Sequence, residues 1–453
     1  MAKDSVAYAC RECGAHAPKW VGRCTACDAW GSLEELAATA ARAQKRGDRR
    51  ARSAALPVSE VPTDTVYRVG TGIGELDRVL GGGAVPGGAV LVGGDPGVGK
   101  STLLLQALGA CARSGPALYV SGEESAAQVA LRARRLGLGE TTLRVLGVSE
   151  LAEIEDEVAQ VWPLAMVVDS VQAVRDAGLG SPAGTITQLR EVTMRLVDLA
   201  QREGTALFLV GHVTKEGGLA GPKVLEHLVD AVLSFEGERG HAFRTLRATK
   251  NRFGSATEVG LFEMTQEGLR EVAQPSAMFL AERPRGASGS IVAATAEGAR
   301  SLLVEVQALV GHPGVGAGRR SATGVDGARL AMLLAVLQRR TSVELGQADV
   351  FVNVAGGLHI EEPAVDLAVA LAVAGAFLAR PAADDLVAFG EVGLAGEVRG
   401  VPRCAARLAE ARAMGFRRVL LPASTAQRTT AAERDGVELV PVRSLEEAID
   451  QMG

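Results

Sequence analysis

A glycine-rich loop of fixed spacing constrains the fold of this 453-residue chain more than any other feature. It matches the pattern G-x4-G-K-[ST] and runs Gly94-Asp95-Pro96-Gly97-Val98-Gly99-Lys100-Ser101-Thr102. An apolar strand precedes the loop and a leucine-rich helix follows it, which is the setting the motif requires. Backbone N–H groups freed by the glycines, together with the helix N-terminus, can bind phosphates. Lys100 would then reach the β/γ-phosphates of ATP, and Ser101 would hold Mg²⁺.

The surrounding residues, 64–270, alternate short apolar runs with helical segments, which is typical of an α/β fold with a parallel sheet. The predicted strands are Ala89–Gly93, Ala117–Ser121, Ala165–Val168, Ala206–Val210 and Ala231–Phe235. Asp169 directly follows one of these strands, where a carboxylate can complete a Mg²⁺ site. Glu123 and Glu124 follow another strand; we expect Glu123 to orient the attacking water, with Glu124 as the alternative. Either carboxylate can also simply favour the first turn of a helix.

Residues 1–36 contain four of the six cysteines, as the two pairs Cys10-x2-Cys13 and Cys24-x2-Cys27. Four thiolates at this spacing predict a closed, structural Zn²⁺ site, and the metal would supply much of the folding energy of so short a module. Disulfide or redox pairs are the alternatives. The first lacks a secretory signal and the second lacks a surrounding βαβ unit.

Charge and hydropathy exclude several classes of protein. The formal net charge of −5 indicates that any nucleic-acid surface is local. Residues 37–63 form a predicted basic linker, which carries Arg42, Lys45, Arg46, Arg49, Arg50 and Arg52. The uncharged helical stretch 367–379 is too short to span a bilayer, which takes about 20 residues. We therefore expect a cytoplasmic protein.

Taken in order, these motifs resemble the RecA-like ATPases, and more closely the RadA (Sms) family of bacterial DNA repair proteins. The resemblance covers essentially the whole chain and is most specific at the signature Lys250-Asn251-Arg252-Phe253-Gly254, supported by the run from Gly211 to Gly217. It implies a RecA-like P-loop core, 64–270, between an N-terminal zinc module and a C-terminal α/β domain, 275–453, similar to the Lon protease domain.

The family assembles rings or filaments with nucleotide between subunits, so the resemblance implies that Lys250 and Arg252 act across an interface. One or both would reach the neighbour's nucleotide or the DNA, where a cation supplied in trans stabilises the transferring phosphoryl group. The segment after Gly211 resembles a DNA-facing loop, in which Lys215 and Lys223 suit phosphate contacts. His212 is either a γ-phosphate sensor or an ordinary histidine.

The Lon-like domain departs from its family at the catalytic pair. The position of the family's serine nucleophile holds Ala364, and the position of its lysine holds Ala405. Because a methyl group can neither attack a carbonyl nor accept a proton, no peptidase is expected. A scaffold for ring assembly is the favoured role for this domain, with DNA contact by its arginines as the second.

Together these features predict a DNA-dependent ATPase of recombinational DNA repair. It would assemble as a hexameric ring and move on single-stranded DNA to extend or process branched intermediates. The zinc module would contact a partner such as the recombinase, or DNA. The alternative is an ATP-gated switch that loads a recombinase without translocation.

Overall fold

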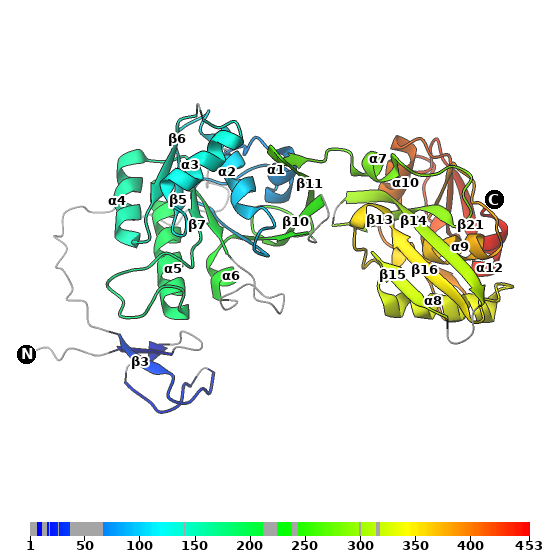
Figure 1. Ribbon diagram of the computed structural model, residues 1–453, viewed down its shortest axis with the longest axis horizontal. Helices are drawn as coiled ribbons and strands as arrows, with labels where there is room; N and C mark the ends of the chain where they lie inside the picture. The colour runs from blue at the N-terminus through cyan, green and yellow to red at the C-terminus, as the bar shows by residue number, and fades with distance from the viewer. Residues whose placement is uncertain are drawn as a thin grey trace, which may run out of the picture. The chain divides into compact units, whose positions relative to one another are not determined.

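The computed structural model describes residues 7–10, 16–17, 19–25, 27–36, 67–139, 141–211, 224–237, 243–298, 300–313 and 318–453. Cys13, the predicted linker 37–63 and the predicted DNA-facing segment 212–223 lie outside the described residues. The chain divides into two compact units, Met1–Glu271 and Val272–Gly453 (Figure 1).

The sheet of the first unit is parallel in its middle and antiparallel at one side. Its strand order is β12-β11-β10-β9-β4-β8-β7-β5-β6. Six strands, from β9 to β6 in that order, pair in parallel, whereas β9 to β12 are antiparallel neighbours. The strands are β4 (Ala89–Gly94), β5 (Ala117–Ser121), β6 (Leu143–Gly147), β7 (Ala165–Asp169), β8 (Ala206–Val210), β9 (Ala231–Glu236), β10 (Phe243–Asn251), β11 (Val259–Thr265) and β12 (Gly268–Glu271).

Each of the five predicted strands is present, and the uninterrupted burial of β4, β5 and β8 explains why they appear as continuous apolar runs. Strand β6, at the edge, is only half-buried, and β10 and β12 carry charged residues, so these three strands lack the continuous apolar run of the predicted ones. Strand β11 begins with a buried apolar run and was missed by the sequence analysis.

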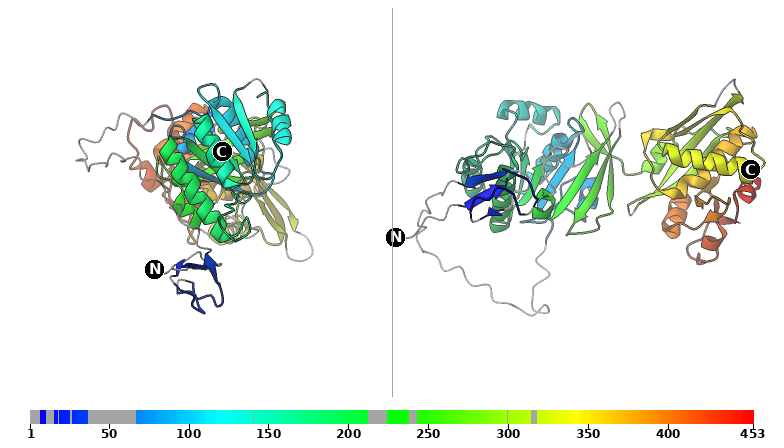
Figure 2. Two further views of the ribbon diagram at one scale, coloured as in Figure 1. Left: turned by 90° about the vertical axis from the view of Figure 1, so that its left-hand side faces the viewer. Right: turned by 90° about the horizontal axis from the view of Figure 1, so that it is seen from below.

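Helices cover both faces of this sheet. One face packs against α1 (Gly74–Leu80), α2 (Lys100–Cys111) and α3 (Ala126–Arg135), and the other against α4 (Leu151–Val161), α5 (Ile186–Glu203) and α6 (Val224–Leu228) (Figures 1 and 2). The expected α/β class, with helices on a mainly parallel sheet, is confirmed. In the part of the chain that the structure describes, no helix has the length and apolar character needed to cross a membrane.

The cysteine segment forms a small antiparallel sheet of β1 (Ala7–Cys10), β2 (His16–Ala17) and β3 (Leu33–Leu36), in the order β2-β1-β3. Its buried cluster consists of Cys10, Cys24 and Leu33. So little buried apolar surface cannot offset the conformational entropy of ordering the segment, which agrees with a fold that depends on metal.

The second unit is a seven-stranded sheet with helices on both faces. Its order is β15-β16-β14-β13-β17-β20-β21, and a separate hairpin pairs β18 with β19. The strands are β13 (Ser290–Glu297), β14 (Arg300–Pro313), β15 (Arg320–Thr323), β16 (Ala348–Val354), β17 (Leu386–Ala388), β18 (Glu391–Val392), β19 (Val398–Arg399), β20 (Arg418–Pro422) and β21 (Glu438–Val442). The helices are α7 (Pro275–Leu280), α8 (Gly327–Arg340), α9 (Asp366–Phe377), α10 (Cys404–Ala413), α11 (Ala423–Ala426) and α12 (Leu445–Asp450).

The uncharged stretch near residue 370 is helix α9, buried along most of its length inside this unit. Its apolar surface is covered by β13, β14 and α8, against which it packs. Ala364 is fully buried in the short 3-10 turn Pro363–Val365 that leads into α9, whereas Ala405 is exposed in the first turn of α10.

A buried ion pair ties α10 to the strand β13. The Arg407 side chain is 0% exposed and donates to the carboxylate of Glu362 and, at 2.5 Å, to the carbonyl of Ala294. The Glu362 carboxylate also accepts from the backbone N–H of Ala296 at 2.6 Å. The guanidinium lies 5.4 Å from the ring centroid of Phe389. Each charge is thus compensated within the fold, as buried charges must be.

Removal of this cation should destabilise the second unit. Arg407→Met leaves the Glu362 carboxylate without its counter-ion, and breaking a buried pair on one side costs about 3–5 kcal/mol. We expect thermal unfolding of the full chain to show an earlier transition for this unit. The matched control is Arg399→Met, which removes an exposed pair with Glu397 and should cost less than about 1 kcal/mol. Equal destabilisation by the two substitutions would contradict the structural role given to the Arg407–Glu362 ion pair.

Candidate nucleotide-binding site

The parallel sheet brings the predicted phosphate-binding residues to one edge. Strands β4, β5 and β7 run in the same direction, so Gly94, Ser121 and Asp169 all stand at carboxyl ends. In the register of the sheet, Ser121 lies directly opposite Asp169. The loop 94–99 leaves β4 and enters α2, which starts at Lys100. This is the edge at which open α/β sheets bind ligands.

Two glycines of the loop are required by its conformation. Gly99 caps α2 with φ 117°, and Gly94 has φ 151°. A Cβ on Gly94 would lie 2.2 Å from the carbonyl oxygen of Phe235, in the neighbouring strand β9. A side chain at either position would therefore move the loop away from the helix N-terminus that a phosphate group needs.

Lys100 extends its amine back into the loop. Its Nζ donates to the carbonyl oxygens of Gly94 at 2.6 Å and Asp95 at 3.0 Å, and the side chain is 4% exposed. Burial lowers the pKa of the amine, while the carboxylates of Asp169, Asp95 and Glu123 oppose this shift. A nearly buried cation beside the loop is complementary to a polyphosphate.

Asp169 ends β7 within a polar group of side chains. Its Oδ2 accepts a hydrogen bond from the hydroxyl of Tyr119, a fully buried residue of β5. Burial is the main cause that raises the pKa of Tyr119, with the Asp169 charge second, so the phenol remains a hydrogen-bond donor. Ser101 also acts on the phenol: its side chain lowers the pKa of Tyr119.

The two adjacent glutamates point to different partners. Glu123 accepts a hydrogen bond from the hydroxyl of Ser170, and its charge acts on Lys100. Glu124 instead pairs with Arg132 of α3 at 2.5 Å. The structure thus brings Glu123 together with Lys100 and Asp169, and directs the Glu124 carboxylate towards the next helix.

Lys250 and Arg252 lie at the end of β10, beside α6. Lys250 Nζ donates to the carbonyl oxygens of Glu226 at 2.5 Å and Val229 at 2.7 Å, and burial lowers the pKa of this amine. Arg252 is 60% exposed and contacts Asp230 at 3.3 Å. Within the described part of this chain, neither cation forms a hydrogen bond or ion pair with the P-loop residues.

The other residues of the signature anchor these two cations. Asn251 Nδ2 donates to the carbonyl of Val79 at 3.1 Å, and Arg68 donates to the carbonyl of Phe253 at 2.7 Å. A Cβ on Gly254 would lie 3.1 Å from the Cα of Gly81. The signature therefore docks closely on the residues that precede the P-loop strand.

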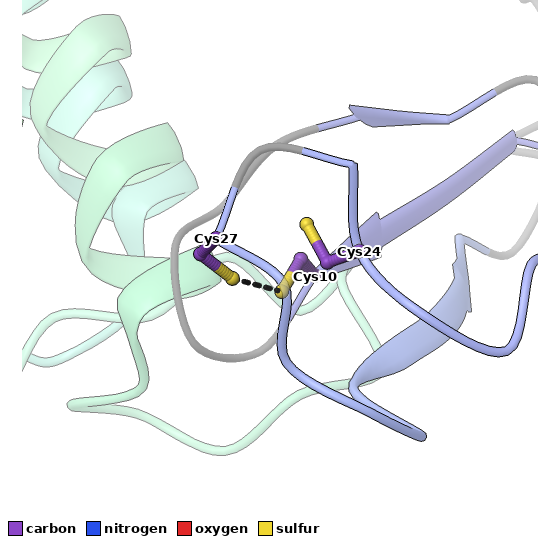
Figure 3. A group of neighbouring side chains, drawn as sticks. All are labelled: Cys10, Cys24 and Cys27. Carbon is purple, nitrogen blue, oxygen red and sulfur yellow. Dashed lines mark hydrogen bonds between the residues drawn. The ribbon is translucent and has the colours of Figure 1, made fainter.

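The described cysteines cluster as a metal site requires. The sulfur atoms of Cys10, Cys24 and Cys27 lie within 4.8 Å of one another, and Cys10 and Cys27 are 3.6 Å apart (Figure 3). In a tetrahedral Zn²⁺ site with Zn–S of 2.3 Å, sulfur atoms are separated by about 3.8 Å. This donor set fits zinc. Cys13, the fourth expected ligand, lies outside the described residues, as do His212, Lys215 and Lys223.

Sequence reasoning missed three polar residues of the site. Tyr119 and Ser170 hold the two carboxylates, and Asp230 holds Arg252 while its Oδ2 accepts from the backbone N–H of Ala89 at 3.1 Å. Ser170 carried a local signal, because it directly follows Asp169. The partners of the other two are far away in the sequence, so no spacing pattern marks them.

Three family models match separate parts of the chain. They are an AAA domain over residues 57–218, a rubredoxin metal binding domain over residues 8–35, and subunit ChlI of Mg-chelatase over residues 327–425. The first covers the P-loop with Asp169, and the second covers both cysteine pairs. The small N-terminal zinc ribbon and the C-terminal Lon-like domain of the expected fold are thereby confirmed.

Relatives match over the full length. The DNA repair protein RadA of Pseudomonas aeruginosa is 49% identical over 100% of both chains. The proteins of the same name from Bacillus subtilis and Escherichia coli are 44% and 45% identical, over 99% of both chains and over 98% of this chain with 97% of the relative. With the resemblance thus confirmed along its whole length, the chain belongs to the RadA family of DNA repair proteins.

Proposed function

We propose that this protein is a DNA-dependent ATPase of recombinational repair that assembles as a hexameric ring and moves on single-stranded DNA. The observation that carries the proposal is the meeting of Lys100, Asp169 and Glu123 at one sheet edge, beside the P-loop. The relatives named DNA repair protein support the DNA substrate. Extension or processing of branched intermediates is the activity proposed for the motor.

Residues 94–102 would bind the phosphates of ATP. The N–H groups of the loop and of the start of α2 would face the phosphate groups of ATP. Lys100 would exchange its carbonyl contacts for the β/γ-phosphate oxygens. Ser101 and Asp169 are the residues that would hold Mg²⁺, whose charge neutralises the phosphates. Hydroxyl and carboxylate oxygens are the ligands that this hard cation prefers.

Glu123 is the group proposed to orient the attacking water. Its carboxylate is exposed to solvent, and the hydrogen bond from Ser170 orients it, as a group that positions water and takes its proton requires. Glu124 is engaged by Arg132, so its charge is already compensated. This difference supports Glu123 over its neighbour.

Lys250 and Arg252 are proposed to act on the nucleotide or DNA of a neighbouring subunit. Arg252 is exposed, and Lys250 is held by the carbonyl oxygens of Glu226 and Val229. Among the residues that the structure describes, neither cation contacts the P-loop of its own chain, which supports a role in trans. A cation delivered by a neighbour couples hydrolysis to assembly.

The flanking parts have proposed roles of their own. The N-terminal ribbon would hold one structural Zn²⁺ and contact DNA or a protein partner such as a recombinase. The second unit would be a scaffold for the ring. Peptidase activity is not proposed for it, because Ala364 and Ala405 occupy the positions of the family's serine and lysine.

The first prediction from the proposed function concerns ATP turnover by the purified full-length chain, measured with and without single-stranded DNA. We expect DNA to stimulate hydrolysis, Lys100→Ala to abolish it, and Lys250→Ala to bind ATP normally but lose the stimulation. Removal of one group that stabilises transferring phosphate costs about 100-fold or more. Arg270→Ala, which removes an exposed ion pair from β12 of the same sheet, is the control.

The opposite result has a defined meaning. Hydrolysis that is sensitive to Lys100→Ala but indifferent to DNA would contradict the motor and favour an ATP-gated loader without translocation. Stimulation that survives both Lys250→Ala and Arg252→Ala would remove these cations from the reaction.

The second prediction separates the two glutamates. Glu123→Gln keeps the shape of the side chain and its contact with Ser170 but cannot take a proton. We expect ATP hydrolysis to fall about 100-fold or more while nucleotide binding is retained. Glu124→Gln, the matched control, should change the rate only several-fold. A larger loss in the Glu124 variant would reverse the assignment.

The third prediction concerns the metal. The purified chain should contain one zinc per protomer by atomic absorption, and Cys10→Ser with Cys24→Ser should release it. Hydrolysis without DNA should persist, because none of the proposed P-loop residues belongs to the cysteine cluster. Cys404→Ser, in the second unit, should retain the metal. A double variant that still contains one zinc per protomer would refute the site.

A further inference from the structure

A buried phenol contacts one of the two residues that the proposed function assigns to Mg²⁺. Tyr119 belongs to β5, and the strand β7 pairs with β5 directly beside it, with Tyr119 opposite Val167. Its side chain is 0% exposed, and its hydroxyl donates to the carboxylate of Asp169, the last residue of β7.

Packing alone does not explain why this position is a tyrosine. A phenylalanine would fill the same volume without a hydroxyl, and a buried hydroxyl must find a partner or destabilise the fold. Tyr119 finds that partner in a carboxylate proposed to hold metal. The neighbouring aromatic of the core, Phe208 in β8, has no such polar group and is equally buried. The hydroxyl is therefore present for the site.

A carboxylate that binds Mg²⁺ has a specific requirement. One of its oxygens must face the cation, and ligating carboxylates are usually oriented by a hydrogen bond from a second residue. The phenol of Tyr119 donates such a hydrogen bond to the Oδ2 atom of Asp169, which restricts the rotation of this carboxylate. Its Oδ1 atom can then face the metal or its water.

We propose that Tyr119 is a positioning residue of the magnesium site, which donates a hydrogen bond to Asp169 and so orients this carboxylate for Mg²⁺. The inference rests on the proposed function, because it presumes that Asp169 holds the ion. Tyr119 itself does not touch the metal or the nucleotide. Its effect is to lower the Mg²⁺ concentration at which the nucleotide binds fully.

The test is Mg²⁺-dependent binding of a fluorescent ATP analogue to the full-length chain, without any measurement of turnover. We expect Tyr119→Phe to raise the half-saturating Mg²⁺ concentration about tenfold, and to leave nucleotide affinity in EDTA within about twofold of wild type. Loss of one hydrogen bond to a charged group corresponds to a change of this order. Tyr67→Phe, at a residue 61% exposed, is the control and should match wild type.

A second variant separates positioning from general damage. If Tyr119 acts through Asp169, the substitution Tyr119→Phe should have little further effect on Mg²⁺ dependence in an Asp169→Asn background. A purely structural role would instead lower affinity equally with and without Mg²⁺ and add fully to the effect of Asp169→Asn. Either of those two results, or an unchanged Mg²⁺ requirement, would overturn the inference.

Failure of the proposed function gives a different pattern. Wild-type nucleotide binding that does not respond to Mg²⁺, or that survives Lys100→Ala, would refute the P-loop assignment and with it the basis for Tyr119. A normal Mg²⁺ response in wild type together with an indifferent Tyr119→Phe would refute the inference alone.

Discussion

The parallel register of β5 and β7 is the constraint on which the nucleotide site depends. It sets Ser121 opposite Asp169, and the backbone N–H of Gly122 donates to the carbonyl of Asp169 at 2.8 Å. This contact fixes where the chain leaves β5, and hence where Glu123 begins. Because a slip of one residue would turn every side chain of a strand to the other face of the sheet, the buried strands fix this register and, with it, the place of Asp169 beside the segment that carries Glu123.

Lys100 and three carboxylates lie together at this sheet edge, where each compensates a charge that would be unfavourable if it were buried alone. A buried amine without partners would lose its proton, and burial does lower the pKa of Lys100. Its two carbonyl contacts and three carboxylate neighbours keep the cation in place. The carboxylates on this edge therefore hold Lys100 in the charged form and in the position that binding of a phosphate chain requires.

How much the sequence predicted depends on how local each feature is. The P-loop, Asp169 and the cysteine pairs were predicted because each depends on a short run of residues in a strand–loop–helix or Cys-x2-Cys pattern. The preference for Glu123 over Glu124 had little support from two adjacent residues of equal chemistry. The difference between their surroundings comes from Ser170 and Arg132, which the fold brings in from elsewhere.

The signature at residues 250–254 also shows what short sequence patterns cannot predict. Its charges drew attention in the sequence, but its neutral members make the long-range contacts. Asn251 reaches Val79, and Phe253 is held by Arg68, so the segment is fixed to residues more than 170 positions earlier. Spacing patterns do not record contacts of that kind, and the strand β10 that carries them is too charged to resemble a core strand.

The second unit holds charged side chains in a largely apolar interior. Position 364 is closed to solvent, and two residues before it Glu362 receives the side chain of the fully buried Arg407. A second carboxylate, the buried Asp366, is paired with the partly exposed Arg329 and accepts the backbone N–H of Val392 at 3.1 Å. Each pair has one buried charge, which is costly to leave without its partner. The two pairs therefore fix the relative positions of β13, α8, α9 and α10, and this is the rigidity that the proposed scaffold role requires.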